Sequence, residues 1–226
     1  MTLPPVFDFH THTLLSDGEL VPAELARRVK VAGYEVLGLA DHADHGCLAG
    51  VLAAARAAAL ALAGHLDGLT VLPGVEITHV PPALIGDLVQ KARDLGASHV
   101  VVHGESPVEP VAPGTNLAAI EAGVDLLAHP GHLSEKEAAR AAEKGVFLEL
   151  SLRGGHGLTN GWVARLARKY GAGLLVSSDG HEVGEYLTPA LQRSTALGAG
   201  LSEEEFTDLL AGAARLAETA LRRLQI

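Results

Sequence analysis

Residues 6–18 read VFDFHTHTLLSDG, a short apolar run that ends in two histidines and passes into a polar turn. In a β-strand, successive side chains point to opposite faces, so His10 and His12 leave the strand on the same side. Asp17 follows in the turn Ser-Asp-Gly. Two imidazoles and a carboxylate at one strand end are the ligand types of a metal site.

The same pattern recurs along the chain, because short apolar runs rich in β-forming residues alternate with helical patterns. We expect one domain spanning residues 1–226. Strands are predicted at residues 6–12, 36–42, 69–79, 99–103, 124–129, 146–152 and 173–178. Helices are predicted at residues 22–32, 48–64, 82–95, 117–122, 134–144, 160–170 and 202–224. Ser202 and Glu205 have capping-box spacing at the start of the last helix.

The fold class follows from the order of these elements. The predicted strands lack polar alternation, which is typical of parallel strands covered on both faces. Seven strands, each followed by a helix, predict an α/β fold, a parallel TIM-like (β/α)7 barrel with one unit fewer than the common eight. An open doubly wound sheet is the alternative, but no glycine-rich phosphate loop follows the first strand.

Composition narrows the class of protein. The formal net charge is −10, and no run of Lys and Arg interrupts it, which predicts no strong nucleic-acid footprint. The apolar stretch at residues 48–66 is broken by Arg56 and His65 and is expected to be a buried helix, not a membrane span. A single cysteine, Cys47, and no secretory signal favour a cytoplasmic enzyme.

Polar residues follow the predicted strands at their ends, one strand after another. In a barrel, the carboxyl ends of all strands face one mouth, so residues far apart in sequence converge there. This set of histidines and carboxylates has too many ligands for one ion, and it predicts two or three divalent ions of zinc, manganese or iron. The residues are His10, His12, Asp17, Asp41, His42, Glu76, His103, His129, Asp179 and His181.

The ordered motifs HTH, SDG, ADH, PGVE, VVHG, AHPG and SDGH resemble those of the PHP (polymerase and histidinol phosphatase) family, in its small histidinol-phosphatase-like subgroup. The resemblance covers nearly the whole chain. It implies a distorted seven-stranded barrel with a metal cluster at its mouth. By motif, a first ion would be held by His10, His12, Glu76 and Asp179, a second by Glu76, His103 and His129, and a third by Asp17, His42 and His181. Asp17 stands where some members have histidine.

Other polar residues are weaker candidates. Asp41 is predicted to orient a ligand imidazole. Arg153, in the turn Arg-Gly-Gly-His, could hold phosphate, and His156 or His181 could protonate a leaving alkoxide. A lid or rim role is expected for Glu105 and Glu109, which frame a proline-rich loop. A further group of histidines lies close to the motifs and could touch substrate: His45, His79, His132 and His156.

These features predict an enzyme that hydrolyses a small phosphate ester, as a phosphomonoesterase, with a metal-activated water. The expected partner is a small phosphorylated substrate, with no membrane, and the sequence does not give the oligomeric state. Three alternatives remain open: a phosphodiesterase or nuclease on short nucleotides, a TatD-like or amidohydrolase-type metal hydrolase, and a catalytically idle metal-binding module.

Overall fold

The computed structural model describes residues 4–224 and contains two parallel β-sheets. The smaller sheet has the order β1-β2-β4, with bounds Val6–Thr11, Tyr34–Leu39 and Thr70–Pro73. The larger sheet has the order β3-β5-β6-β7-β8-β9, with bounds His42–Ala43, Val75–Ile77, Val100–His103, Leu126–Ala128, Phe147–Ser151 and Leu174–Ser177.

Two of the predicted strands are each split into a pair. The strand expected at residues 36–42 becomes β2 and β3, and the strand expected at residues 69–79 becomes β4 and β5. The second break falls at Gly74, where an added Cβ would lie 2.3 Å from the ring of His99. Each pair contributes one strand to each sheet, so the chain passes between sheets at these breaks.

The two sheets also meet at β1 and β9. An isolated parallel bridge joins Thr11 to Gly180, and the His12 amide donates to the Gly180 carbonyl at 3.0 Å. The Asp179 amide donates to the His10 carbonyl at 3.0 Å. The parallel α/β class predicted from the sequence is therefore confirmed, and the strands occur as two sheets joined at these places.

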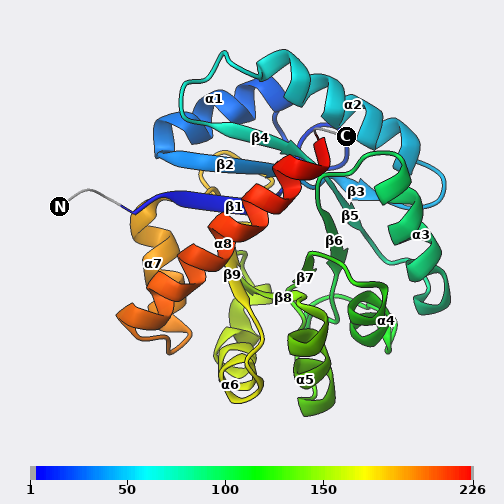
Figure 1. Cartoon of the computed structure of the whole chain (residues 1–226), viewed down its shortest axis with the longest axis vertical. Helices are drawn as coiled ribbons and strands as arrows, with labels where there is room; N and C mark the ends of the chain where they lie inside the picture. Colours follow the sequence, from blue (N-terminus) through cyan, green and yellow to red (C-terminus); the bar gives the residue numbers. More distant parts are fainter. Residues whose placement is uncertain (1–3, 225–226) are drawn as a thin grey trace.

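Helices follow the strands and lie around them (Figure 1). Sequence patterning missed α7, which Thr188 caps by accepting from the Leu191 amide, and the short 3-10 helix η1. Within residues 4–224, none of the helices has the length and apolar character needed to cross a bilayer. The bounds are α1 Pro22–Ala32, α2 Leu48–Leu62, α3 Pro82–Asp94, α4 Thr115–Ala122, α5 Glu135–Lys144, η1 His156–Thr159, α6 Asn160–Tyr170, α7 Pro189–Gly198 and α8 Glu203–Leu224.

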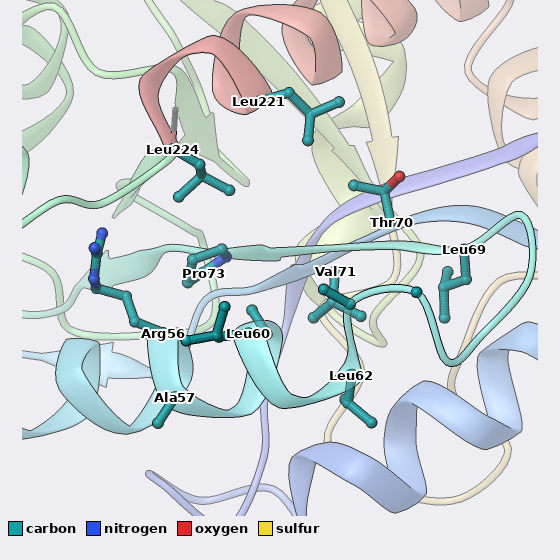
Figure 2. Close-up of a pocket in the computed structure, with 13 residues that line it drawn as sticks. Arg56, Ala57, Leu60, Leu62, Leu69, Thr70, Val71, Pro73, Leu221 and Leu224 are labelled. Carbon is teal, nitrogen blue, oxygen red and sulfur yellow. The ribbon is translucent and has the colours of Figure 1, made fainter. Parts of the chain in front are cut away.

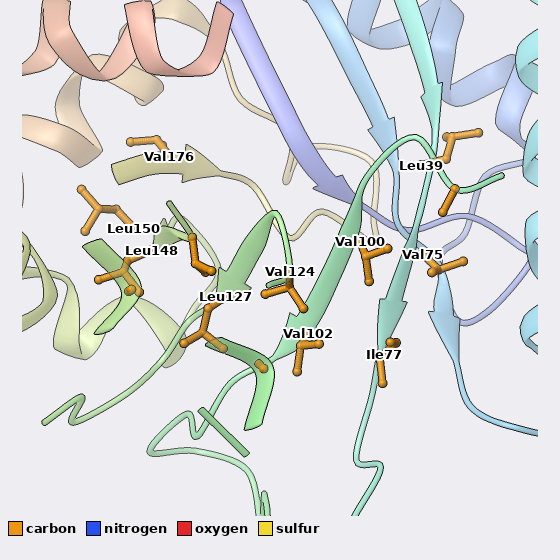
Figure 3. Packing of buried hydrophobic residues seen from close by; sticks show 14 of the residues in the cluster. Leu39, Val75, Ile77, Val100, Val102, Val124, Leu127, Leu148, Leu150 and Val176 are labelled. Atoms are coloured by element: carbon orange, nitrogen blue, oxygen red, sulfur yellow. The ribbon is translucent and has the colours of Figure 1, made fainter. Parts of the chain in front are cut away.

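Alternate residues of the strands enter two different apolar clusters. Val100 and Val102 of β6 belong to the larger cluster, together with helix residues (Figure 3). Val101, between them, belongs to a second cluster with residues of α8. This alternation is the two-residue period of a strand, and it gives the sheets one face toward the outer helices and one toward a shared interior.

Helix α8 closes one end of this interior. It crosses in front of the strands in Figure 1, and its Leu216 and Ala220 cluster with Phe7, Phe9 and Leu72 of the strands. The predicted capping box is present, because the Glu205 amide donates to Ser202 Oγ and the Ser202 amide donates to Glu205 Oε2. The polar ends of the strands lie away from this apolar closure.

A cavity of about 440 Å³ lies between α2, β4 and the end of α8 (Figure 2). Its lining includes Leu60, Leu62, Val71 and Leu221, with Arg56 at one side. None of the predicted metal ligands lines it. The titratable groups instead converge at the carboxyl ends of the strands, around His10, His12, Glu76 and Asp179, and this region is called the mouth below.

Candidate metal centre

The end of β1 delivers the first two imidazoles. His10 and His12 are fully buried. The backbone here is fixed on both sides, because Thr11 Oγ1 donates to the Gly38 carbonyl at 2.8 Å and the His12 amide bonds to Gly180. The two histidines therefore sit between β2 and the loop that carries Asp179.

Glu76 of β5 lies at the middle of the polar mouth. Its Oε1 is 3.3 Å from His10 Nε2, and its Oε2 is 2.7 Å from His42 Nδ1. The same carboxylate is 3.8 Å from His12 Nε2 and from His129 Nε2. Burial alone would raise the pKa of Glu76, but the imidazoles of His10 and His42 outweigh it and hold that pKa well below its usual range.

The predicted ligands come together as overlapping groups in which one donor atom per residue lies within 4.8 Å of the others. His12 belongs to two of the three groups given next, and the Glu76 carboxylate lies within 3.8 Å of a histidine nitrogen in each of the three. Three of these groups contain only predicted ligands: His10, His12 and Asp179; Glu76, His103 and His129; and His12, Asp17, His42 and His181.

Several donor atoms in these groups are buried without a hydrogen-bond partner among the described residues: His10 Nε2, both ring nitrogens of His12, Glu76 Oε1 and His129 Nδ1. Unpaired buried polar atoms are costly in a folded protein, and they gather where a ligand or ion satisfies them. Imidazole and carboxylate donors in this number suit zinc, manganese or iron. The residues present therefore fit divalent metal ions.

The electrostatics of the mouth also favour cations. Burial would lower the pKa of His42, but the carboxylates of Glu76 and Asp17 raise it to about 10. Burial likewise opposes protonation of His10, yet Glu149, Glu76 and Asp179 hold its pKa well above the usual range. The carboxylates thus draw positive charge to His10 and His42, whereas burial and the neighbouring imidazoles hold the pKa values of His12 and His129 well below the usual range.

Glu149 is a residue that sequence reasoning missed. His10 Nδ1–H donates to its Oε1 at 2.8 Å, and the His129 amide donates to its Oε2 at 2.8 Å. A carboxylate on the far nitrogen of a histidine fixes the ring and leaves the other nitrogen free to bind an ion. The alternation of residues along β8 could have indicated this role. Leu148 and Leu150 belong to the larger apolar cluster, so Glu149 between them faces the interior.

Asp41 differs from its predicted role. Its carboxylate accepts from the Thr13 amide at 2.7 Å, from Thr13 Oγ1 and from Ser16 Oγ at 2.8 Å, and within residues 4–224 it has no hydrogen bond to an imidazole. The Thr13 amide and hydroxyl lie closer to it than any ring nitrogen, because the chain folds back after His12. Asp41 thus holds the turn that carries Asp17, rather than orienting the ring of His42.

Arg153 reaches the mouth from the loop after β8. Its Nη1 donates to the Asp179 carbonyl at 3.1 Å and to Glu185 Oε2 at 3.2 Å, and lies 2.6 Å from His181 Nδ1. Glu185 also accepts from the His181 amide at 2.8 Å. The guanidinium is therefore held beside Asp179 and His181 and remains partly exposed.

Of the four histidines predicted to touch substrate, two lie at the mouth and two lie elsewhere. His156 lies in the mouth, with its Nε2 3.9 Å from Asp179 Oδ2, and burial lowers its pKa while Glu109 partly offsets this. His79 lies at the edge of the mouth, where its Nε2 is 3.1 Å from Glu109 Oε2. His132 instead packs against Trp162, at 6.2 Å between ring centroids, and His45 is exposed.

Backbone strain is concentrated at the same place. Three residues other than glycine have positive φ in residues 4–224: His79 at 53°, His129 at 25° and Asp179 at 52°. All three directly follow or closely follow the carboxyl end of a strand and face the mouth. Left-handed backbone is costly for side-chain-bearing residues and is retained where it aims a functional group.

The fold and the donor set together define a parallel α/β protein with TIM-barrel-like neighbours and candidate divalent-metal groups at its mouth. Among solved structures, an archaeal ribonuclease P with mature tRNA contains a chain with TM-score 0.66 and 14% identity, covering 96% of this chain and 93% of that one. Histidinol phosphate phosphatase from Lactococcus lactis, solved with zinc, L-histidinol and phosphate, has TM-score 0.62 and 13% identity, covering 86% and 94%. These likenesses show the fold.

The uncharacterized protein MJ1295 of Methanocaldococcus jannaschii is 42% identical over 205 residues, covering 90% of this chain and 94% of that protein. This chain belongs to the same family as MJ1295. Ribonuclease P protein component 3 of Methanosarcina mazei is 28% identical, covering 93% of this chain and 87% of that protein. No family model matches the chain.

The predicted partners need correction. The strand-end motifs predict a small phosphorylated substrate, and the net acidic composition predicts no strong nucleic-acid footprint. That expectation is wrong, because the relatives with a named role include ribonuclease P protein components of two Methanosarcina species, and a solved structure of this fold is ribonuclease P with tRNA. Net charge is a bulk quantity, and it does not report how charge is distributed at one face.

Proposed function

We propose that this protein is a metal-dependent phosphoesterase of the PHP type. The observation that supports the proposal most strongly is the overlap of three histidine–carboxylate groups at one mouth, with buried donor atoms that lack partners in the described part of the chain. Clusters of this kind, with carboxylates between neighbouring groups, suit two- and three-ion hydrolytic sites. The order of the sequence motifs and the fold of histidinol phosphate phosphatase agree with it.

In this proposal the ligands are those the motifs indicate. Glu76 would hold both the first and the second ion, and Asp41 holds the turn that would present Asp17 to the third. Glu149 orients His10 through its Nδ1–H. The first ion would be held by His10, His12, Glu76 and Asp179, the second by Glu76, His103 and His129, and the third by Asp17, His42 and His181.

When bound, the ions would supply a water of lowered pKa and neutralise charge on the phosphoryl oxygens. The chain's own residues then bind and orient the ester. Arg153 donates from its remaining N–H groups to a phosphoryl oxygen, because Glu185 and the Asp179 carbonyl already fix its Nη1 at the mouth. His156 donates a hydrogen bond from its Nε2–H to a phosphoryl oxygen, whereas His181 is retained as a ligand because its Nε2 faces Asp17 at 3.3 Å.

The test combines metal analysis with turnover. We expect two or three ions per chain in the purified protein and hydrolysis of p-nitrophenyl phosphate that chelation abolishes and added zinc or manganese restores. Bis(p-nitrophenyl) phosphate, assayed in parallel, separates a monoesterase from a diesterase. Protein that carries no metal, or hydrolysis that survives full chelation, would contradict the proposal.

A second candidate is action on, or binding to, nucleic acid, and it is favoured by specific relatives. Ribonuclease P protein component 3 from two Methanosarcina species and the DNA polymerase/3'-5' exonuclease PolX of Bacillus subtilis align over 87% or more of this chain, although the chain covers 37% of PolX. In this case the phosphate at the mouth would belong to RNA or DNA.

The nucleic-acid candidate is tested by binding and cleavage on the same preparation. Fluorescence anisotropy with labelled tRNA and with single-stranded DNA, repeated across salt concentrations, measures affinity and the number of phosphate contacts. Gel analysis with and without chelator measures cleavage. Affinity that neither changes with salt nor exceeds that of a protein of equal net charge would count against this candidate.

A further inference from the structure

Glu109 lies among three imidazoles that come from three different strands or loops. Its Oε2 is 3.1 Å from His79 Nε2 and 3.2 Å from His103 Nε2, and its Oε1 is 3.3 Å from His156 Nε2. His79 follows β5, His103 ends β6 and His156 begins η1. The Glu109 carboxylate thus occupies a site lined by side chains from three separate parts of the chain.

With His79 and His103, Glu109 forms one of the groups that could hold a metal ion, but two of its three imidazole neighbours can also present N–H groups to an oxyanion. Ser106 Oγ lies 2.7 Å from His156 Nδ1, so the hydroxyl can donate to Nδ1 and leave the Nε2–H to donate toward Glu109. His79 Nε2 donates to the other carboxylate oxygen. His103, beside them, is proposed to hold the second ion. Two N–H donors next to a metal position match the oxygens of a phosphate group.

Glu109 differs from the other carboxylates of the mouth in how it is held. The side chains of Glu76 and Asp179 are 0% and 5% exposed, and both come from strands or directly follow one. The side chain of Glu109 is 37% exposed and lies on the loop of residues 104–114, which has no helix or strand. A carboxylate in that position can be displaced without unpacking the core.

The loop is fixed at its base by backbone amides, whereas its tip is held by side-chain contacts. Glu105 ties the two ends together, because its Oε1 accepts from the Gly114 amide at 2.9 Å and the Asn116 amide at 3.0 Å. At the tip, Val108 rests against Gly155, where an added Cβ would lie 3.0 Å from Val108 Cγ1. The segment with Glu109 can therefore lift while its base stays in place.

His79 carries an independent sign of function. Its φ of 53° is one of three positive values outside glycine, and the other two belong to His129 and Asp179, both proposed ligands. His79 is not in the proposed ligand set, and its ring points to Glu109. Strain at this residue is explained if the ring must be presented to a ligand at this place.

We propose that His79 and His156, beside His103, form a seat for an oxyanion of the phosphate type, and that Glu109 fills this seat until substrate displaces it. The tip of the loop of residues 104–114, which carries Glu109, is then a lid that the incoming phosphate opens. This inference rests on the proposed phosphoesterase function for its meaning, but the seat itself is defined by contacts that need no turnover.

The experiment is calorimetric titration of inorganic phosphate into the protein as purified, for wild type, Glu109→Gln and Glu182→Gln. Removing the competing carboxylate is expected to tighten phosphate binding about tenfold in Glu109→Gln. Glu182 is an exposed residue of a neighbouring mouth loop, so Glu182→Gln removes the same charge and is expected to bind as wild type does. A second substitution, His79→Ala in the Glu109→Gln protein, is expected to reverse the gain.

Two results would overturn the seat: phosphate affinity that is equal in wild type and a folded Glu109→Gln protein, or loss of one metal ion per chain in Glu109→Gln, which would make Glu109 a permanent ligand. Hydrogen exchange in residues 104–114 is expected to rise when phosphate is added, and unchanged exchange would remove the lid. If neither protein hydrolyses any ester while the affinities differ as expected, the proposed function fails and the seat stands.

Discussion

The two ends of the interior enclosed by the strands have opposite chemistry. At the α8 end, Phe7, Leu72 and Leu216 pack against one another in an apolar cluster. At the mouth, His10 and Glu76 are equally buried but have nitrogen and oxygen atoms without hydrogen-bond partners in residues 4–224. The α8 end stabilises the fold, whereas the unpaired polar atoms at the mouth would gain partners when cations bind. A protein of this kind separates stability and chemistry along the same strands.

The largest expected effect is at the centre of the mouth. Glu76→Gln removes the charge that lies between the first two proposed ions, so turnover should fall by at least about a thousandfold and metal content should drop. Elemental analysis and p-nitrophenyl phosphate hydrolysis measure both. The free energy of unfolding of the metal-free protein should not fall with them. Full activity in folded Glu76→Gln protein would dismiss the ligand assignment.

The opposite result is expected at the α8 end. Leu216→Ala leaves a cavity in the apolar cluster and should lower the free energy of unfolding by about 3 kcal/mol, as measured by urea denaturation. Metal content per folded chain should equal that of wild type. A loss of metal together with stability would show that the two ends are not separate.

His99 gives a pH-dependent test in the region between the two ends. Its Nε2–H donates to the Phe9 carbonyl at 3.0 Å, and burial lowers its pKa from 6.5 to about 4. The unfolded chain therefore takes up a proton first as pH falls, so stability is fully present above 6.5 and is lost toward 4, by about 3 kcal/mol. Urea melts of wild type and His99→Gln across that window measure it, and equal slopes would refute the assignment.

The smallest of these effects is expected behind the ligands. Glu149→Gln keeps the shape of the side chain but weakens its hold on His10, so metal affinity should fall by about ten- to a hundredfold. Competition with a chelating dye measures the affinity. The exposed Glu143→Gln serves as the charge-matched control. An unchanged affinity in Glu149→Gln would show that His10 is oriented by its backbone alone.

Much of the fold was predictable because apolar runs and helix periodicity are local properties. Helices α1 and α6 begin and end where the sequence predicted. The break at Gly74 was not predictable, because it depends on the ring of His99, a residue far along the chain. Helix α7 was missed because its start, Thr188 followed by Pro189, comes directly after a loop without an apolar pattern.

The candidate site shows the same division. Residue types at strand ends, such as His103 and Asp179, are written in the sequence, and parallel topology brings them together. Hydrogen-bond partners are not written in the sequence. Asp41 is therefore predicted to orient an imidazole, although its carboxylate accepts hydrogen bonds from Thr13 and Ser16. Glu109 could be placed on a loop from sequence, but its three imidazole neighbours come from the fold.

The junction of β1 with β9 has a consequence for how the chain matures. Asp8 bonds to the Ser178 hydroxyl, and the His10 carbonyl accepts from the Asp179 amide, across about 170 residues of sequence. During synthesis, His10 leaves the ribosome long before Asp179 exists. Ion uptake at the first proposed position must then wait until the last strand docks, so an interrupted chain would be released without a competent centre.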